Sequence, residues 1–139
     1  MAIFSLTNAQ VLVNGVDLSD HCDQVTVTDM RDSIDITTFG ASSKAVTKGL
    51  GDAKIELQLF QDFAAGKVHA TLQPLIGSST PVQVEVRAVN GARSATNPGI
   101  VMQGLLMSYS ALDGAMNQAS KLKAEFTNGS NAGMSYPTS

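Results

Sequence analysis

The sequence predicts a single, mainly β domain: a β-sandwich or partly closed β-barrel of seven to eight strands with one α-helix. Three observations support this prediction. Apolar and polar residues alternate in several short segments, turn residues separate those segments, and only one segment has helical spacing. The length of 139 residues is that of one domain, and an apolar content of 43% is enough for one core.

The first predicted strands form a hairpin near the N-terminus. Residues 11–13 and 16–18 flank the Asn-Gly pair at 14–15, which supplies the positive φ angles of a tight two-residue turn. Alternation continues in two more short segments, at residues 25–27 and 34–36. The first third of the chain therefore contains at least four short β-segments.

The remaining strands follow the same period of two. The clearest is Val82-Gln-Val-Glu-Val-Arg-Ala88, in which every second residue is apolar. The predicted strands in this part of the chain are residues 55–59, 82–88, 100–110 and 122–126.

One segment, residues 63–75, has apolar residues at roughly helical spacing and is the predicted helix. We expect Asp62 to cap its first turn, where the helix dipole favours a negative charge. Pro74 and Gly77 are expected to end it.

Two long connections and the C-terminal segment lack a strand pattern. Residues 40–51 are small, basic and rich in Gly and Ser, and residues 90–99 are similar, so both are predicted to be functional or adaptable loops. Residues 128–139 are polar and should be disordered by themselves. The predicted organisation is a β domain with an N-terminal arm over 1–127 and a C-terminal tail over 128–139, with both termini contacting neighbouring subunits.

The low charge content favours association. Charged residues make up 15% of the chain, against roughly 25% in typical soluble domains, and weak self-repulsion promotes assembly. The net charge of −3 argues against dedicated nucleic-acid binding. Residues 1–35 carry six acids and one base, whereas residues 36–139 carry eight bases and six acids. Opposite faces of a head-to-tail assembly could therefore be complementary, or the acids could form one solvated edge.

Candidate chemistry gathers around His21 and Cys22, which have several aspartates nearby. A zinc site would need a second CxxC or HxxxH partner, which the sequence lacks. A calcium site of the EF-hand type is not indicated, because the acids do not have its spacing. A Cys/His nucleophile pair is not favoured, because adjacent residues on a strand point to opposite faces. We interpret this segment as a polar turn with a small buried thiol, and the acids around Arg31 as turn residues. No phosphate-binding glycine motif, serine elbow or HExxH is present. The sequence thus predicts no catalytic, metal or cofactor site and no enzyme.

The chain is expected to be made in a cytosol and not secreted by the usual route. Its N-terminus has no basic region of the kind a signal peptide carries, and no apolar run approaches the roughly 18 residues of a membrane span. Cys22 is the only cysteine, so an intramolecular disulfide is excluded.

Several segments, in their order and spacing, resemble the major tail (tail tube) proteins of long-tailed, non-contractile-tailed phages, especially those that infect actinobacteria. Val11-Leu-Val-Asn-Gly-Val-Asp-Leu-Ser-Asp-His21 resembles the opening hairpin of that family, and Arg31-Asp-Ser-Ile-Asp-Ile-Thr-Thr-Phe-Gly40 its R-D-x-x-D-V-T-x-F-G stretch. Further segments that resemble the family are 48–52, 52–62, 63–72, 94–98 and 109–114. The sequence after Thr127 does not match it.

The resemblance implies a tail-tube fold and a structural role. Such proteins form six-membered rings that stack around a tape measure protein into a tube, which later conducts the genome. The implied partners are the chain itself, the tape measure protein, the tail terminator and tail tip proteins. DNA would pass through without specific binding, no membrane would be involved, and the protein would reside in the virion tail after synthesis in the bacterial host cytoplasm.

Three groups of residues are candidate assembly sites. A ring-stacking loop would contain Phe39, Gly40, Lys44, Lys48, Gly49 and Asp52. Its partner would be an acidic face on the next ring, made of Asp17, Asp20, Asp23, Asp29, Asp32 and Asp35. The outward polar positions of three strands are candidates to line the lumen: Lys54, Glu56, Gln58, Gln83, Glu85, Arg87, Lys121, Lys123 and Glu125.

Other functions fit the composition and remain open. A monomeric immunoglobulin-like binding or decoration module would have the same strands. A ligand-binding barrel or hydrolase-like enzyme would need convergent polar groups in a pocket, and the sequence shows no such set. A related contractile or secretion-system tube would share the fold.

Overall fold

A computed structural model describes residue 3 and residues 5–139. Within them the chain forms one eight-stranded antiparallel sheet with the order β2-β1-β5-β6-β7-β4-β3, in which β8 pairs with β6. The strands are β1 (Gln10–Val13), β2 (Val16–Asp17), β3 (Cys22–Asp35), β4 (Val46–Phe60), β5 (Val82–Arg87), β6 (Ile100–Tyr109), β7 (Lys121–Asn128) and β8 (Met134–Ser135). A 3-10 turn (Ser19–His21) precedes β3, and α1 spans Val68–Ile76.

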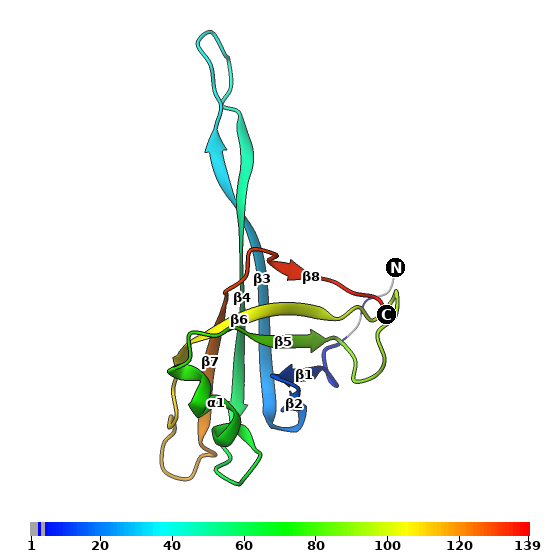
Figure 1. Cartoon of the computed structure of the whole chain (residues 1–139), viewed down its shortest axis with the longest axis vertical. Coiled ribbons are helices and arrows are strands. Elements are labelled where there is room, and N and C mark those ends of the chain that lie inside the picture. The colour runs from blue at the N-terminus through cyan, green and yellow to red at the C-terminus, as the bar shows by residue number, and fades with distance from the viewer. Residues whose placement is uncertain (1–2, 4) are drawn as a thin grey trace.

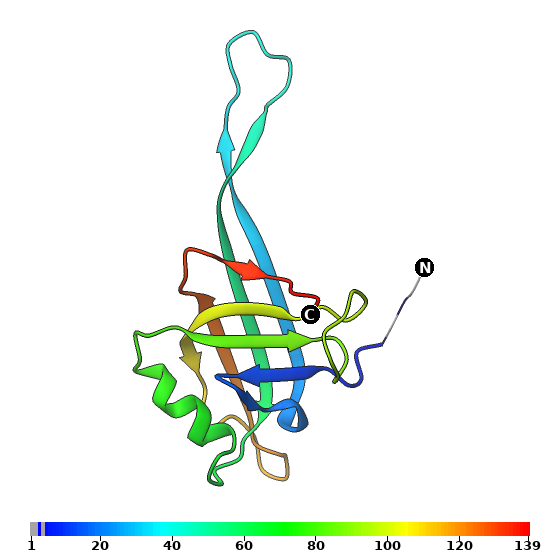
Figure 2. The ribbon, with the colours of Figure 1, turned by 45° about the vertical axis from the view of Figure 1, so that its right-hand side comes forward.

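The sheet bends so that its two halves face each other. In Figures 1 and 2, β1, β5 and β6 run across β3, β4 and β7, and α1 lies at one side of the body. The sheet does not close into a barrel, because β2 and β3 are the two ends of the strand order. The mainly β prediction is confirmed, and the partly closed arrangement takes the form of one open, folded sheet.

The core lies between these halves and follows the predicted alternation. On β4, Ile55, Leu57 and Leu59 are buried, and the polar residues between them are not. From α1, Val68 and Leu72 complete the same apolar cluster, and the helix packs against β6. Burial of these side chains is the main stabilisation of the fold.

The predicted hairpin is confirmed. Asn14 and Gly15 have φ angles of 51° and 81°, which joins β1 to β2 through the two-residue turn that Asn-Gly favours. The next prediction was wrong in extent: residues 25–27 and 34–35 belong to one continuous strand, β3, which ends before residue 36. Residues 46–51, expected to be loop, are the first part of β4, because their backbone pairs with the far end of β3.

The helix is shorter than predicted and begins five residues later. Gly66 has a φ of +73°, which keeps the preceding segment out of helical geometry, and Lys67 is the N-cap. Asp62 therefore does not cap α1; its Oδ1 accepts a hydrogen bond from the Ala64 N–H at 2.9 Å. Pro74 lies inside the helix and does not end it, whereas Gly77 stands at the C-cap as expected.

The C-terminal segment, expected to be disordered alone, is held by its own chain. β8 pairs with β6 through Met134 and Ser135. The hydroxyl of Tyr136 donates to Asp29 Oδ2 at 2.7 Å, and the Gly99 N–H donates to the carbonyl of Pro137 at 2.9 Å. At the other terminus, the expected contacts of residues 1, 2 and 4 lie outside the described residues.

Among the residues that the structure describes, α1 is the α-helix, and no helix has the length and hydropathy needed to span a membrane.

Candidate assembly surfaces

The far ends of β3 and β4 leave the body as a long two-stranded arm, which we define as residues 30–52 (Figure 1). Apolar side chains are exposed along it, and Phe39 at the tip is fully exposed, at 108% of its reference area. The exposed large apolar residues of the arm are Met30, Ile34, Ile36, Phe39, Val46 and Leu50. A two-stranded ribbon has no core of its own, and an exposed apolar surface of this kind marks an interaction site.

The arm has a bulge near its base. Arg31 pairs with Gly51 and Ser33 with Lys48, so β4 contains one more residue than β3 in this interval. Long side chains from β3 lie across the glycines of β4: a Cβ added at Gly49 would be 3.1 Å from the Ile34 Cδ1. Side chains of β3 therefore pack directly on these glycines of β4, and a larger residue at either glycine would displace them.

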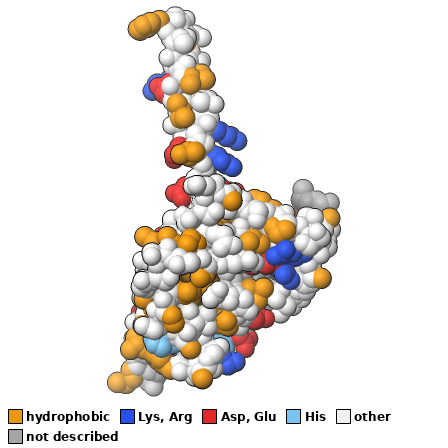
Figure 3. Space-filling view, in the orientation of Figure 1, with side chains coloured by type: hydrophobic (Ala, Val, Ile, Leu, Met, Phe, Trp, Pro, Cys, Tyr) orange, Lys and Arg blue, Asp and Glu red, His pale blue; other side chains and the backbone are white. Residues whose placement is uncertain are grey.

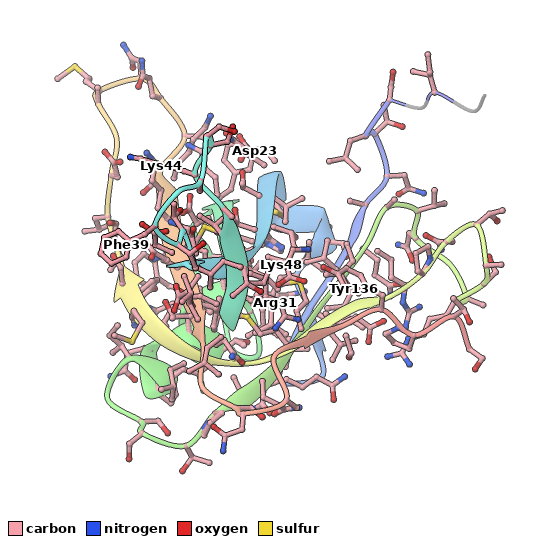
Figure 4. All side chains as sticks on the ribbon, turned by 90° about the horizontal axis from the view of Figure 1, so that it is seen from above. Asp23, Arg31, Phe39, Lys44, Lys48 and Tyr136 are labelled. Carbon is pink, nitrogen blue, oxygen red and sulfur yellow. The ribbon has the colours of Figure 1, made fainter. Side chains whose placement is uncertain are left out.

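The predicted stacking residues all lie on this arm, although not in one loop. Phe39, Gly40 and Lys44 are at the tip, and Gly40 has a φ of +84°. The other three, Lys48, Gly49 and Asp52, are on β4. Figure 4, which looks down onto the arm, shows Phe39 and Lys44 toward one side of the molecule and Tyr136 toward the other.

The structure does not bring the six predicted acids together on one face. Asp32 and Asp35 lie on the arm and Asp29 precedes it on β3. At about 3.3 Å per residue the distance from Asp23 to Asp35 is on the order of 40 Å. The remaining acids are on the body and already have partners in the chain. Asp17 accepts from the Ser19 N–H, Asp20 contacts His21, and Asp23 lies 3.2 Å from Lys121 Nζ.

Two of the three predicted lumen triplets share one surface. β4 and β7 are neighbours, with Glu56 opposite Glu125 and Gln58 opposite Lys123, so their polar side chains project from the same face of the sheet. This face is hollowed by a cavity of about 280 Å³. Its lining includes Gln24, Thr26, Glu56, Gln58, Ser108, Ser110, Lys123 and Glu125. Lys54 lies beside it and pairs with Glu56 at 3.1 Å. At the start of β7, Lys121 lies over the Phe60 ring, with its Nζ 5.4 Å from the ring centre.

The third triplet corrects the sequence prediction. Glu85 on β5 is 2% exposed and cannot face a channel. Its carboxylate accepts hydrogen bonds from Arg93 Nη2 at 2.6 Å and Arg87 Nε at 2.5 Å. The hydrogen bonds from Arg93, and then those from Arg87, outweigh burial and hold the pKa of Glu85 below its usual value. The loop over residues 90–99 brings Arg93 over β5, which alternation alone could not indicate. Gln83 remains exposed.

A second exposed apolar surface lies at the opposite end of the molecule from the arm. It is formed by the segments 61–67 and 110–120, which Gln61 joins by donating from its backbone N–H to Ser120 O at 2.9 Å. We call its exposed side chains, Phe63, Leu112 and Met116, the apolar foot; Met116 is 90% exposed. Sequence reasoning missed it, because isolated apolar residues in a loop have no period.

The His21–Cys22 segment is a polar junction. The two ring nitrogens of His21 lie 2.8 Å from Asp20 and 2.9 Å from Asp62. Burial lowers the pKa of His21, but the hydrogen bonds to both carboxylates outweigh it, so the pKa is raised. Cys22 is half-buried, and this burial raises the pKa of its thiol. In the described part of the chain no three His, Cys, Asp or Glu side chains are grouped to hold a metal ion.

No family model matches the sequence, and no curated protein matches it. Similarity is found among solved structures. A chain in the virion of a native gene transfer agent particle aligns with a TM-score of 0.72 and 8% identity, covering 93% of this chain and 95% of the other. A chain in the tail of an empty gene transfer agent particle with C6 symmetry aligns with a TM-score of 0.62 and 11% identity, covering 84% and 81%.

The Dit protein of phage SPP1, described as a hub of the adsorption apparatus, aligns with a TM-score of 0.51 and 15% identity. The match covers 90% of this chain and 51% of Dit. The chain therefore has the tail-tube-like fold found in phage tails and phage-related particles, as the sequence resemblance implied.

Proposed function

We propose that this protein is a structural subunit of a phage tail tube, in which six copies form a ring and the rings stack into a conduit for DNA. The observation that carries this proposal is the apolar arm on a tail-tube-like fold. The arm has large apolar side chains in water and no core to bury them. Assembly with further copies of the chain would remove these six side chains from water, which favours a self-assembling subunit over a module that remains monomeric.

Ring formation is supported by the open ends of the sheet. β3 is an edge strand of 14 residues, and β2 is the opposite edge. Edge strands present unpaired N–H and C=O groups that pair readily with another chain. Contacts between two different edges are head-to-tail, and such contacts form a ring when the rotation between copies closes. A six-membered ring is the symmetry that the family resemblance implies.

We propose that the hollow face of β3, β4 and β7 lines the lumen. Its charged side chains are two lysines, Lys54 and Lys123, and two acids, Glu56 and Glu125. A wall with balanced charge does not neutralise phosphates or release many counterions, so a duplex can slide past it. Gln58 lines the same face and Lys121 lies beside it, so both remain candidates, whereas the buried Glu85 does not.

The tape measure, terminator and tip proteins are proposed as partners on the family resemblance, and the virion tail as the location. The exposed ends of a stacked tube would be the surfaces available to the terminator and tip proteins.

Electron microscopy and light scattering of the purified protein test the proposal. We expect rings or tubes whose mass rises with concentration. A matched variant replaces residues 36–45 by an Asn-Gly turn, which removes the arm tip and leaves the body unchanged. This variant should keep the circular dichroism spectrum of a β protein and should not form tubes. If the unaltered protein remains a monomer at every concentration, the tube proposal is wrong and a binding module is the better reading.

A further inference from the structure

We infer that the tip of the arm docks on the apolar foot of the next copy along the tube. This inference rests on the proposed function, because it names the surface that receives the arm. It replaces the acidic face as receiver, and its occupant is a second copy of this chain.

The two surfaces lie at opposite ends of one long molecule. Figures 1 and 2 show the arm tip at one end of the long axis and the connections from β4 to α1 and from β6 to β7 at the other. Figure 3 shows apolar side chains at both ends. A single chain cannot join them, but two copies placed end to end along this axis can. A contact between two different surfaces of identical chains propagates, as a stack of rings requires.

Both surfaces expose large apolar side chains without neighbours to bury them. Phe39 at the tip and Met116 on the foot are among the most exposed large apolar residues that the structure describes, at 108% and 90%. An aromatic ring that enters a methionine-containing surface makes favourable contacts between sulfur and the ring edge. Burying both groups at once removes apolar area from water on each copy.

The charges of the two segments are complementary and sparse. Residues 36–45 contain one charged side chain, Lys44, and residues 110–120 contain one, Asp113. None of the ion pairs among the described residues includes either side chain. The contact would therefore bring two opposite charges together. Neither segment contains another charged side chain that would have to be desolvated.

The acidic face is a less suitable surface for docking of the arm tip. Asp17, Asp20 and Asp23 line part of a polar groove on the body, but each already has a partner in its own chain. A lysine that docked there would compete with existing hydrogen bonds and ion pairs, whereas Asp113 is in no ion pair with the residues that the structure describes.

Cross-linking in assembled tubes tests the inference. In a Cys22→Ser background, Ser42→Cys near the arm tip and Ala115→Cys next to Met116 are made as separate chains and mixed in equal amounts during assembly. Both positions are exposed, and both variants keep Phe39 and Met116. A short bismaleimide is then added, and cross-linked pairs are identified by mass spectrometry. Ser79→Cys, exposed on the connection between α1 and β5, replaces Ala115→Cys in the control mixture.

We expect cross-links between positions 42 and 115 to be at least tenfold more abundant than cross-links between positions 42 and 79. Tubes that form but give equal yields for the two mixtures, or that link position 42 mainly to itself, would overturn the inference and leave the tube proposal standing. If Cys22→Ser and the unaltered protein both fail to form rings or tubes, the proposed function fails, and the docking inference fails with it.

Discussion

The imidazole of His21 joins two separate parts of the chain, with Nε2 lying 2.9 Å from Asp62 Oδ2. His21 ends the turn before β3, and Asp62 follows β4. The contact therefore joins the segment that enters β3 to the segment that leaves β4. Because Nδ1 also faces a carboxylate, that of Asp20, the doubly protonated ring can donate in both directions.

This contact predicts a pH dependence of stability. The folded-state pKa of His21 is raised, so its contribution is fully present below the unfolded pKa of about 6.5 and is lost as pH rises through the folded pKa. We expect the urea midpoint of the unassembled, arm-shortened protein to fall from pH 6 to pH 8. In His21→Gln this fall should be smaller. Equal slopes for the two proteins would show that His21 does not stabilise the fold through its charge.

Phe39→Ser should impair assembly without affecting the fold. Its side chain is fully exposed and has no packing within the chain to lose, so the free energy of unfolding should change by less than about 0.5 kcal/mol. Tubes should be shorter or absent in electron micrographs. The contrasting variant is Phe126→Ala in the core, which should cost about 3–5 kcal/mol in urea denaturation. A Phe39→Ser protein that assembled normally would exclude the tip from stacking.

A charge reversal should separate the two candidate receivers of the arm. Lys44→Asp alone and Asp113→Lys alone should each reduce tube length, because each places like charges at the proposed contact. The combination of both changes should restore it, and the single-variant effects should weaken at high salt. Length measured by electron microscopy at two salt concentrations is the readout. Failure of the double variant to recover, with both singles impaired, would contradict the pairing of Lys44 with Asp113.

Replacement of Glu by Gln at positions 85 and 56 should lower the free energy of unfolding by very different amounts. Glu85→Gln leaves Arg87 and Arg93 without their buried carboxylate, and we expect a loss of about 2 kcal/mol. Glu56→Gln removes the partner of the exposed Lys54 and should change stability by less than about 1 kcal/mol. Urea denaturation of the arm-shortened protein measures both. Similar costs at the two sites would mean that the Glu85 cluster contributes little.

Lysines at the proposed lumen should retain DNA. Glu56→Lys with Glu125→Lys makes the hollow face basic, so phosphates would be neutralised and the duplex held, most strongly at low salt. Tubes should still assemble, but genome release from virions that carry them should be slower. The neutral variant Glu56→Gln with Glu125→Gln controls for loss of the acids themselves. Release at the normal rate from the lysine variant would place this face outside the channel.

Local patterns predicted much of the fold. The Asn14-Gly15 turn was identifiable because few residue pairs adopt two consecutive positive φ angles, and the alternation on residues 55–59 indicated a half-buried strand. The start of α1 was not identifiable from spacing, since Phe63 fits the helical period although Gly66 interrupts the helix. Residues 46–51 have the composition of a loop and become strand only because β3 pairs with them.

The sequence by itself determined the β-rich domain, the polar and apolar sides of its strands, and a charge content low enough for assembly. Only the tertiary structure decided what each side faces. Alternation places Glu56 and Glu85 equally on polar sides, yet one lies on an open face and the other is buried under a loop that carries Arg93. The exposure of Phe39 and Met116 at opposite ends of the molecule is likewise a property of the folded chain, because it depends on contacts between segments far apart in sequence, which no local pattern contains.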